Sequence, residues 1–194
     1  MGIDDLSNLF DNSYIAKPQN LLVEETDPNG GKSPYKEIAI NASGYKYLTI
    51  RLREGFKMFP FFHKYDVTKP NDNPPEGLLL MCDYLLFAES TKIENCPLYV
   101  ILIELKGSET SHARKQLESG KVFWEYIYAT AKRLDLDPDS RKVKLKKLII
   151  QGKGLPKVKP TTNPKPFHKV EDYVKAERWN KEDKIDIDLL ITRF

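Results

Sequence analysis

The chain has 194 residues, of which 40% are hydrophobic and 30% charged, and its net charge is +3. This composition predicts a globular domain and excludes a coiled coil or a wholly disordered chain. The two cysteines lie in no CxxC or Cys/His cluster, which argues against a disulfide scaffold and a zinc finger. The apolar runs are shorter than the roughly 20 residues that a membrane span needs, and the first residues do not resemble a signal peptide. We therefore expect a reduced, cytoplasmic protein with no membrane partner.

Positions 1–35 are largely polar and contain several prolines and glycines, which predicts a partly irregular arm. One domain is expected over 36–194. Three strands are expected next, at 45–52, 78–87 and 98–106. The second and third are nearly continuous apolar runs, as expected of strands buried on both faces. Because only ten residues join them, we expect an antiparallel hairpin in which Phe87 lies opposite Leu98.

A helix is predicted after a cap at Thr110 or Ser111, and Asp137-Pro138 ends it. Its apolar stripe alternates gaps of four and three residues through Ala113, Leu117, Gly120, Trp124, Ile127, Ala131 and Leu134. Beyond it we expect a strand at 146–151, a proline-rich loop at 152–166, a short helix at 170–179 and an alternating strand at 185–191. The order β-β-β-α-β-α-β predicts an α/β (α+β) fold, a central mixed sheet flanked by helices.

Basic residues are concentrated between positions 141 and 169, where the chain has ten lysines and arginines and no acid. Such a block attracts polyanions and predicts nucleic acid as a partner. The alternative is an ordinary solvated lysine surface. The residues that we expect to contact nucleic acid are Arg141, Lys142, Lys144, Lys146, Lys147, Lys153, Lys157 and Lys159.

Charged residues also interrupt the two apolar strands. Glu104 and Lys106 end the third strand on one face, and Asp83 is the single charge of the second. With Phe87 opposite Leu98, Asp83 is the diagonal neighbour of Glu104, about 7–8 Å away between Cα atoms. Two carboxylates so placed can share a hard cation, with the Leu105 carbonyl as a further oxygen ligand. The alternative is a structural salt bridge between Glu104 and Lys106.

The pattern of Asp83 followed by Glu104-Leu105-Lys106 resembles the PD-(D/E)xK, or restriction-endonuclease-like, nucleases over residues 45–151. The resemblance implies an α-β-β-β-α-β core and Mg²⁺, or Mn²⁺, held by Asp83 and Glu104. It also implies that Lys106 is the catalytic lysine and that Gln116 is the helix glutamine found in some branches. Cys82 replaces the proline of the signature, and Glu37 and Glu54 both stay open as the family's upstream glutamate.

These expectations describe a metal-dependent nuclease that hydrolyses phosphodiester bonds, in DNA rather than RNA. Endonuclease and exonuclease action, and a homodimer, all stay open. Two other classes of function also stay open: a non-catalytic nucleic-acid-binding module with the same fold, and a structural or interaction domain with a buried salt bridge.

Overall fold

The structure is a computed structural model that describes residues 2–16, 20–22, 37–52, 81–106, 113–136, 142–151, 167–170, 173–176 and 184–193. Its helices are α1 (Ile3–Ser7), α2 (Ala113–Arg133) and α3 (Ile187–Arg193). Its strands are β1 (Asn20–Leu22), β2 (Glu37–Asn41), β3 (Tyr45–Arg51), β4 (Tyr84–Ser90), β5 (Leu98–Lys106), β6 (Val143–Gln151), β7 (Phe167–Val170), β8 (Tyr173–Ala176) and β9 (Lys184–Asp186). The predicted helix cap and the proline-rich stretch 152–166 lie outside the described residues.

The main sheet has six strands in the order β3-β4-β5-β6-β8-β7. β3, β4 and β5 pair antiparallel, β5, β6 and β8 pair parallel, and β7 returns antiparallel to β8. The parallel pair β5–β6 is joined through α2, as a parallel connection requires. β1, β2 and β9 form a separate small sheet. The predicted mixed sheet with flanking helices is therefore confirmed, as is the antiparallel β4–β5 hairpin.

The register of that hairpin differs from the prediction by two residues. Phe87 pairs with Val100 rather than Leu98, and Tyr84 pairs with Ile103. Continuing this register, Asp83 stands directly across from Glu104 and is not its diagonal neighbour. Because side chains alternate with a period of two, a shift of two residues changes the cross-strand partner of Asp83 without changing the face predicted for it.

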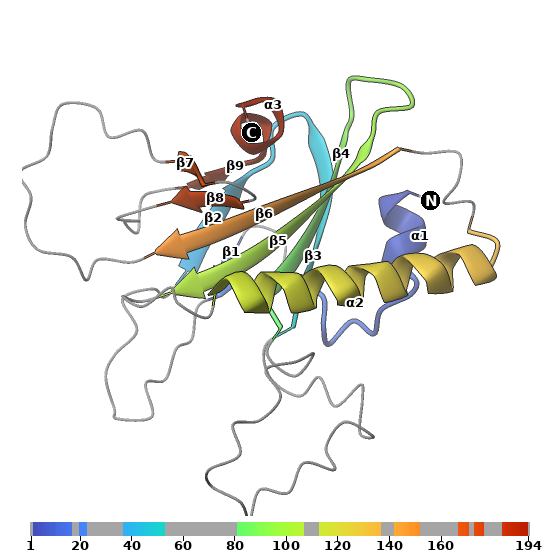
Figure 1. Cartoon of the computed structure of the whole chain (residues 1–194). Helices are drawn as coiled ribbons and strands as arrows, with labels where there is room; N and C mark the ends of the chain where they lie inside the picture. Colours follow the sequence, from blue (N-terminus) through green and yellow to red (C-terminus); the bar gives the residue numbers. More distant parts are fainter. Residues whose placement is uncertain are drawn as a thin grey trace, which may run out of the picture.

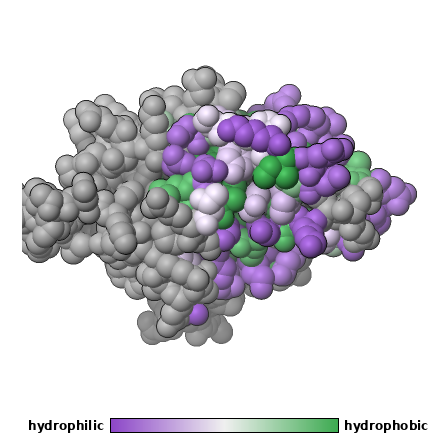
Figure 2. Space-filling view, turned by 90° about the horizontal axis from the view of Figure 1, so that it is seen from above, coloured by the Kyte–Doolittle hydropathy of each residue, from purple (hydrophilic) through white to green (hydrophobic). Residues whose placement is uncertain are grey.

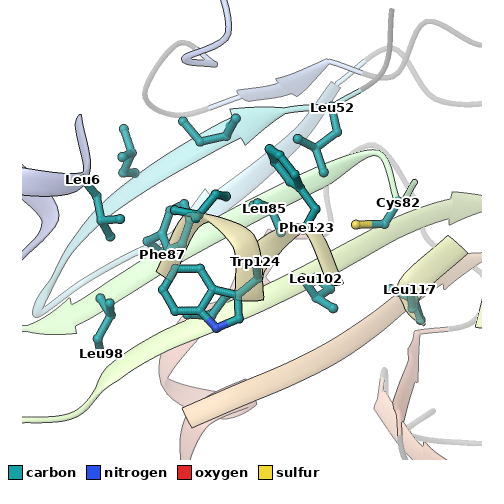
Figure 3. Packing of buried hydrophobic residues seen from close by; sticks show 14 of the residues in the cluster. Leu6, Leu52, Cys82, Leu85, Phe87, Leu98, Leu102, Leu117, Phe123 and Trp124 are labelled. Atoms are coloured by element: carbon teal, nitrogen blue, oxygen red, sulfur yellow. The ribbon is translucent and has the colours of Figure 1, made fainter. Parts of the chain in front are cut away.

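Helices cover both faces of the main sheet (Figure 1). α1 and α2 pack on one face, where Leu85, Phe87 and Trp124 belong to a single apolar cluster. Figure 3 shows this cluster, in which Phe87 lies against Trp124 with ring centroids 5.5 Å apart. On the other face, Ile187 and Leu190 of α3 close a second cluster. The buried stripe of α2 confirms the predicted periodicity except at Leu134, which follows the helix and is half-exposed.

Two predicted elements near the C-terminus are wrong. Within 170–179, the described residues are strand and not helix: Val170 ends β7 and Tyr173–Ala176 form β8, where Val174 is buried beside β6. The strand expected at 185–191 is only β9, because the chain turns into α3 at Ile187. Asp186 explains this change, since its Oδ1 accepts a hydrogen bond of 3.0 Å from the Leu189 amide, the contact of a helix cap.

Seen from above the view of Figure 1, hydrophilic residues cover much of the described surface, with small hydrophobic areas between them (Figure 2). Among the described residues, no helix combines the length and apolarity needed to cross a bilayer.

Candidate functional site

Asp83 is fixed at the point where β4 begins. Its backbone carbonyl accepts a hydrogen bond of 2.8 Å from the Leu52 amide, which follows β3. Its Oδ2 accepts another of 2.8 Å from the Leu105 amide of β5. The residue is 8% exposed. Asp83 is thus anchored between the two neighbouring strands, and the position of its carboxylate is set by main-chain groups.

Glu104 and Lys106 project from the end of β5, on the face covered by α2. Glu104 is only 1% exposed, and its Oε1 lies 2.6 Å from the Lys106 Nζ. The Lys106 side chain is 19% exposed, so the base of this ion pair is more accessible to solvent than the acid. The ion pair that the alternative interpretation expected is therefore present, with its acid buried and its base partly accessible.

The environment of Glu104 opposes its ionisation. Burial is the largest effect, and together with the nearby Asp83 carboxylate it raises the pKa of Glu104 from 4.5 to about 8, although Lys106 acts in the opposite direction. If both carboxylates were ionised they would outnumber the one lysine, so a cation bound beside them would favour the ionised form of Glu104.

Gln116 occupies the first turns of α2, which begins beside the end of β5 (Figure 1). Its Oε1 and the Oε2 of Glu104 are both buried, and neither has a hydrogen-bond partner among the described residues. Buried oxygen atoms without partners are costly, and each one calls for an explanation such as an absent water or ion. The structure thus leaves two oxygen acceptors unsatisfied at the predicted site.

These donors fit a hard divalent cation. Carboxylate and amide oxygens are its usual ligands, and Mg²⁺ commonly takes only one or two protein carboxylates and completes its shell with water and phosphate oxygens. Among the described residues, no group of three or more His, Cys, Asp or Glu side chains is placed to hold a metal. The candidate set is therefore the Asp83 and Glu104 carboxylates, with the Gln116 amide and the predicted Leu105 carbonyl.

The described part of the basic segment does not form one continuous face. Lys147 lies on the α2 side, where its Nζ is 2.5 Å from Glu118 Oε1. Lys144 lies on the other side, with its Nζ 5.7 Å from the Tyr99 ring centroid. Lys142 is exposed next to the start of β6, whereas Glu104 pairs with Ile149 near the end of that strand. Lys146 also belongs to β6, while Arg141, Lys153, Lys157 and Lys159 lie outside the described residues.

Sequence reasoning missed one feature of this site. The sequence pattern indicates Gly120 only as a small member of the apolar stripe, and Cys82 only as a departure from the family signature. In the structure they touch: a Cβ built on Gly120 would lie 2.4 Å from Cys82 Sγ. The signal that could have revealed this contact is a glycine in the middle of a helix. Glycine lowers helix stability, so its presence there suggests that close packing leaves no space for a side chain.

Comparison of the chain with family models, with curated proteins and with solved structures gives no match in any of the three.

Proposed function

We propose that this chain is a metal-dependent nuclease of the PD-(D/E)xK type that hydrolyses phosphodiester bonds, with DNA the favoured substrate. One observation carries the proposal. Asp83 directly precedes β4, Glu104 lies in β5 and Gln116 in α2, and two buried oxygens, one on Glu104 and one on Gln116, have no partner among the described residues. A purely structural ion pair explains Lys106 and one oxygen of Glu104, but it leaves these two oxygens unexplained.

Asp83 and Glu104 would hold Mg²⁺ or Mn²⁺, with Gln116 contributing directly or through water. Such a cation supplies charge stabilisation at a phosphate and lowers the pKa of a bound water. Lys106 provides an ammonium next to Glu104, which holds it in place, on a side chain that is partly exposed. In this role Lys106 would orient the attacking water and stabilise the negative charge that develops on the phosphate oxygens. The Asp83–Leu105 hydrogen bond keeps one carboxylate in position throughout.

The decisive experiment is incubation of the purified chain with linear and circular, single- and double-stranded DNA, and with RNA, in Mg²⁺, Mn²⁺ or EDTA. We expect cleavage of DNA that requires a divalent ion and stops in EDTA. Calorimetric titration with Mn²⁺ in the absence of DNA measures the cation site separately. Mn²⁺ binding with no cleavage of any substrate would favour the non-catalytic binding module. Absence of both would leave a structural salt bridge.

Reversing the charge of Lys142 and Lys144 tests the basic segment. We expect the Lys142→Glu/Lys144→Glu protein to bind duplex DNA more weakly. The slope of log affinity against log salt should fall by about 0.9 for each phosphate that the protein no longer neutralises. Binding is measured by fluorescence anisotropy at several salt concentrations, in EDTA. The matched control is Lys46→Glu/Lys92→Glu, which reverses two lysines outside the segment. If both double variants lost the same DNA affinity, the basic segment would contribute only through the total charge of the protein and not through contacts of its own.

A further inference from the structure

Helix α2 makes a very close approach to the sheet at Gly120. A Cβ at this position would meet Cys82 Sγ at 2.4 Å, Cys82 Cβ at 3.6 Å and Leu102 Cδ2 at 3.7 Å. The first distance is too short for any real contact, while the other two are ordinary van der Waals distances. Among the described residues, only the thiol sulfur of Cys82 therefore stands in the way of a side chain at position 120.

Each side of this contact adjoins a residue of the candidate site. Cys82 directly precedes Asp83 in the chain, and Gly120 lies one helical turn after Gln116. Figure 3 places Cys82 at the same end of the apolar cluster as Leu117, which follows Gln116.

We propose that Gly120 and Cys82 are positioning residues whose contact sets the distance between Gln116 and the carboxylates of Asp83 and Glu104. This inference rests on the proposed function, because it assigns the contact a role in cation binding. It explains why a helix otherwise rich in good helix formers carries glycine at a buried position.

A side chain at position 120 has few ways to be accommodated. Cys82 is 1% exposed, and its Sγ lies 3.5 Å from the Tyr84 carbonyl, a weak hydrogen bond within the core. If the sulfur yields, it has to move within a filled core next to Asp83. If the sulfur stays, α2 has to move outward and carry Gln116 with it. Either adjustment alters the geometry of the oxygen donors.

The test is calorimetric titration of Mn²⁺ into Gly120→Ala in the absence of nucleic acid, below the melting temperature of the variant. We expect its affinity for Mn²⁺ to be about 10-fold or more below that of the wild type, the effect typical of disturbing residues that orient metal ligands. Alanine has a higher helix propensity than glycine, so propensity alone predicts that the substitution leaves the stability of α2 unchanged or raises it. Ser119→Ala, on the neighbouring solvent side of α2, is the matched control and should bind as the wild type does.

The double variant Cys82→Ala/Gly120→Ala provides a rescue. With the sulfur removed, the two Cβ atoms would be 3.6 Å apart, which is a normal contact. We therefore expect the double variant to recover most of the Mn²⁺ affinity that Gly120→Ala loses. Cys82→Ala alone completes the cycle, and the non-additivity of the two substitutions measures the effect of their contact.

The outcomes separate this inference from the proposed function. Wild-type protein that does not bind Mn²⁺ would defeat the proposed function itself. Wild-type binding together with unchanged binding by folded Gly120→Ala would overturn the positioning role alone. If Gly120→Ala fails to fold, the double variant decides: recovered folding and affinity support the inference, whereas recovered folding with weak affinity refutes it.

Discussion

Replacing Lys106 with alanine is expected to reduce DNA cleavage by roughly 10²–10³-fold, the loss typical of removing a preorganised charge from a transition state. Affinity for Mn²⁺ should change much less, because two effects oppose each other. Removing the ammonium lowers repulsion of the cation, but it also leaves Glu104 without the partner that favours its ionised form. Single-turnover cleavage rates and calorimetric Mn²⁺ titration, made on the same preparations, measure the two effects separately.

Lys121→Ala is the matched control for Lys106. Lys121 is also ion-paired with a glutamate, Glu125 at 3.7 Å, but both side chains are exposed on α2. Its removal should leave cleavage within about 2-fold of the wild type and change stability by less than about 1 kcal/mol. A Lys106→Ala protein that is strongly destabilised, from a parent that cleaves no substrate, would show instead that the ion pair serves the fold.

Glu104→Gln is expected to stabilise the metal-free protein while abolishing cleavage. The pKa of Glu104 is raised to about 8 in the folded protein, chiefly by burial. The folded chain therefore holds this proton more tightly than the unfolded chain, for which the ordinary value of 4.5 applies. The free energy of unfolding of the wild type should decrease as the pH rises from about 4.5 to about 8, and above that this contribution is constant. Glutamine cannot ionise and avoids the loss.

At pH 8 to 9 in EDTA, the gain in the free energy of unfolding should be roughly 2–5 kcal/mol, where the upper figure follows from the full pKa difference. Near pH 5 the two proteins should differ little. Mn²⁺ should raise the melting temperature of the wild type and not that of Glu104→Gln, since only the former keeps both carboxylates. Denaturant titrations across this pH range give the measurement.

Glu118→Gln serves as the comparison, because Glu118 also pairs with a lysine but is about half-exposed. Its free energy of unfolding should change by no more than about 1 kcal/mol, with no matching pH dependence. A destabilised Glu104→Gln protein at pH 8 would contradict the excess negative charge inferred for the site. It would identify the Glu104–Lys106 pair as a stabilising salt bridge.

The sequence predicted the central elements well because their patterns are long and consistent with their burial. The apolar run that ends in Glu104 and Lys106 is β5 with the bounds expected, and the four-three spacing predicted most of the buried face of α2. Alternation alone also predicted that Asp83 and Glu104 share one face. The side-chain ion pair and the two unpartnered oxygens required three-dimensional packing.

The register of the β4–β5 hairpin was not predictable from a symmetric loop. β4 continues to Ser90, and its turn is shaped by local contacts: the Ser90 amide donates to Cys96 Sγ at 3.2 Å, and Asn95 adopts a φ of 55°. These contacts accompany a pairing that is shifted by two residues from the prediction. Because the shift is even, the inference about the acid pair was unaffected.

The C-terminal errors arose where tertiary pairing outweighed local pattern. Val174 forms a strand because the edge of β6 offers it a partner, with Leu148 opposite. At Asp186 the sequence does contain a helix signal, an aspartate before Ile187 and a second acid in the first turn, but the alternation of isoleucines favoured a strand. Leu190 breaks that alternation and is buried, as a helical spacing from Ile187 requires.

The residues of the candidate site come from neighbouring parts of the sequence, since β4, β5 and α2 are consecutive elements of the chain. Ordering such neighbouring segments costs little loop-closure entropy compared with joining distant ones. The outer strands β7 and β8, in contrast, are short and, within the described part of the chain, join the sheet through β6. When the native protein opens locally, these outer strands should detach first, and the amides of β4 and β5 should exchange with solvent only on global unfolding. The acid pair would thus remain assembled in partly opened forms of the chain.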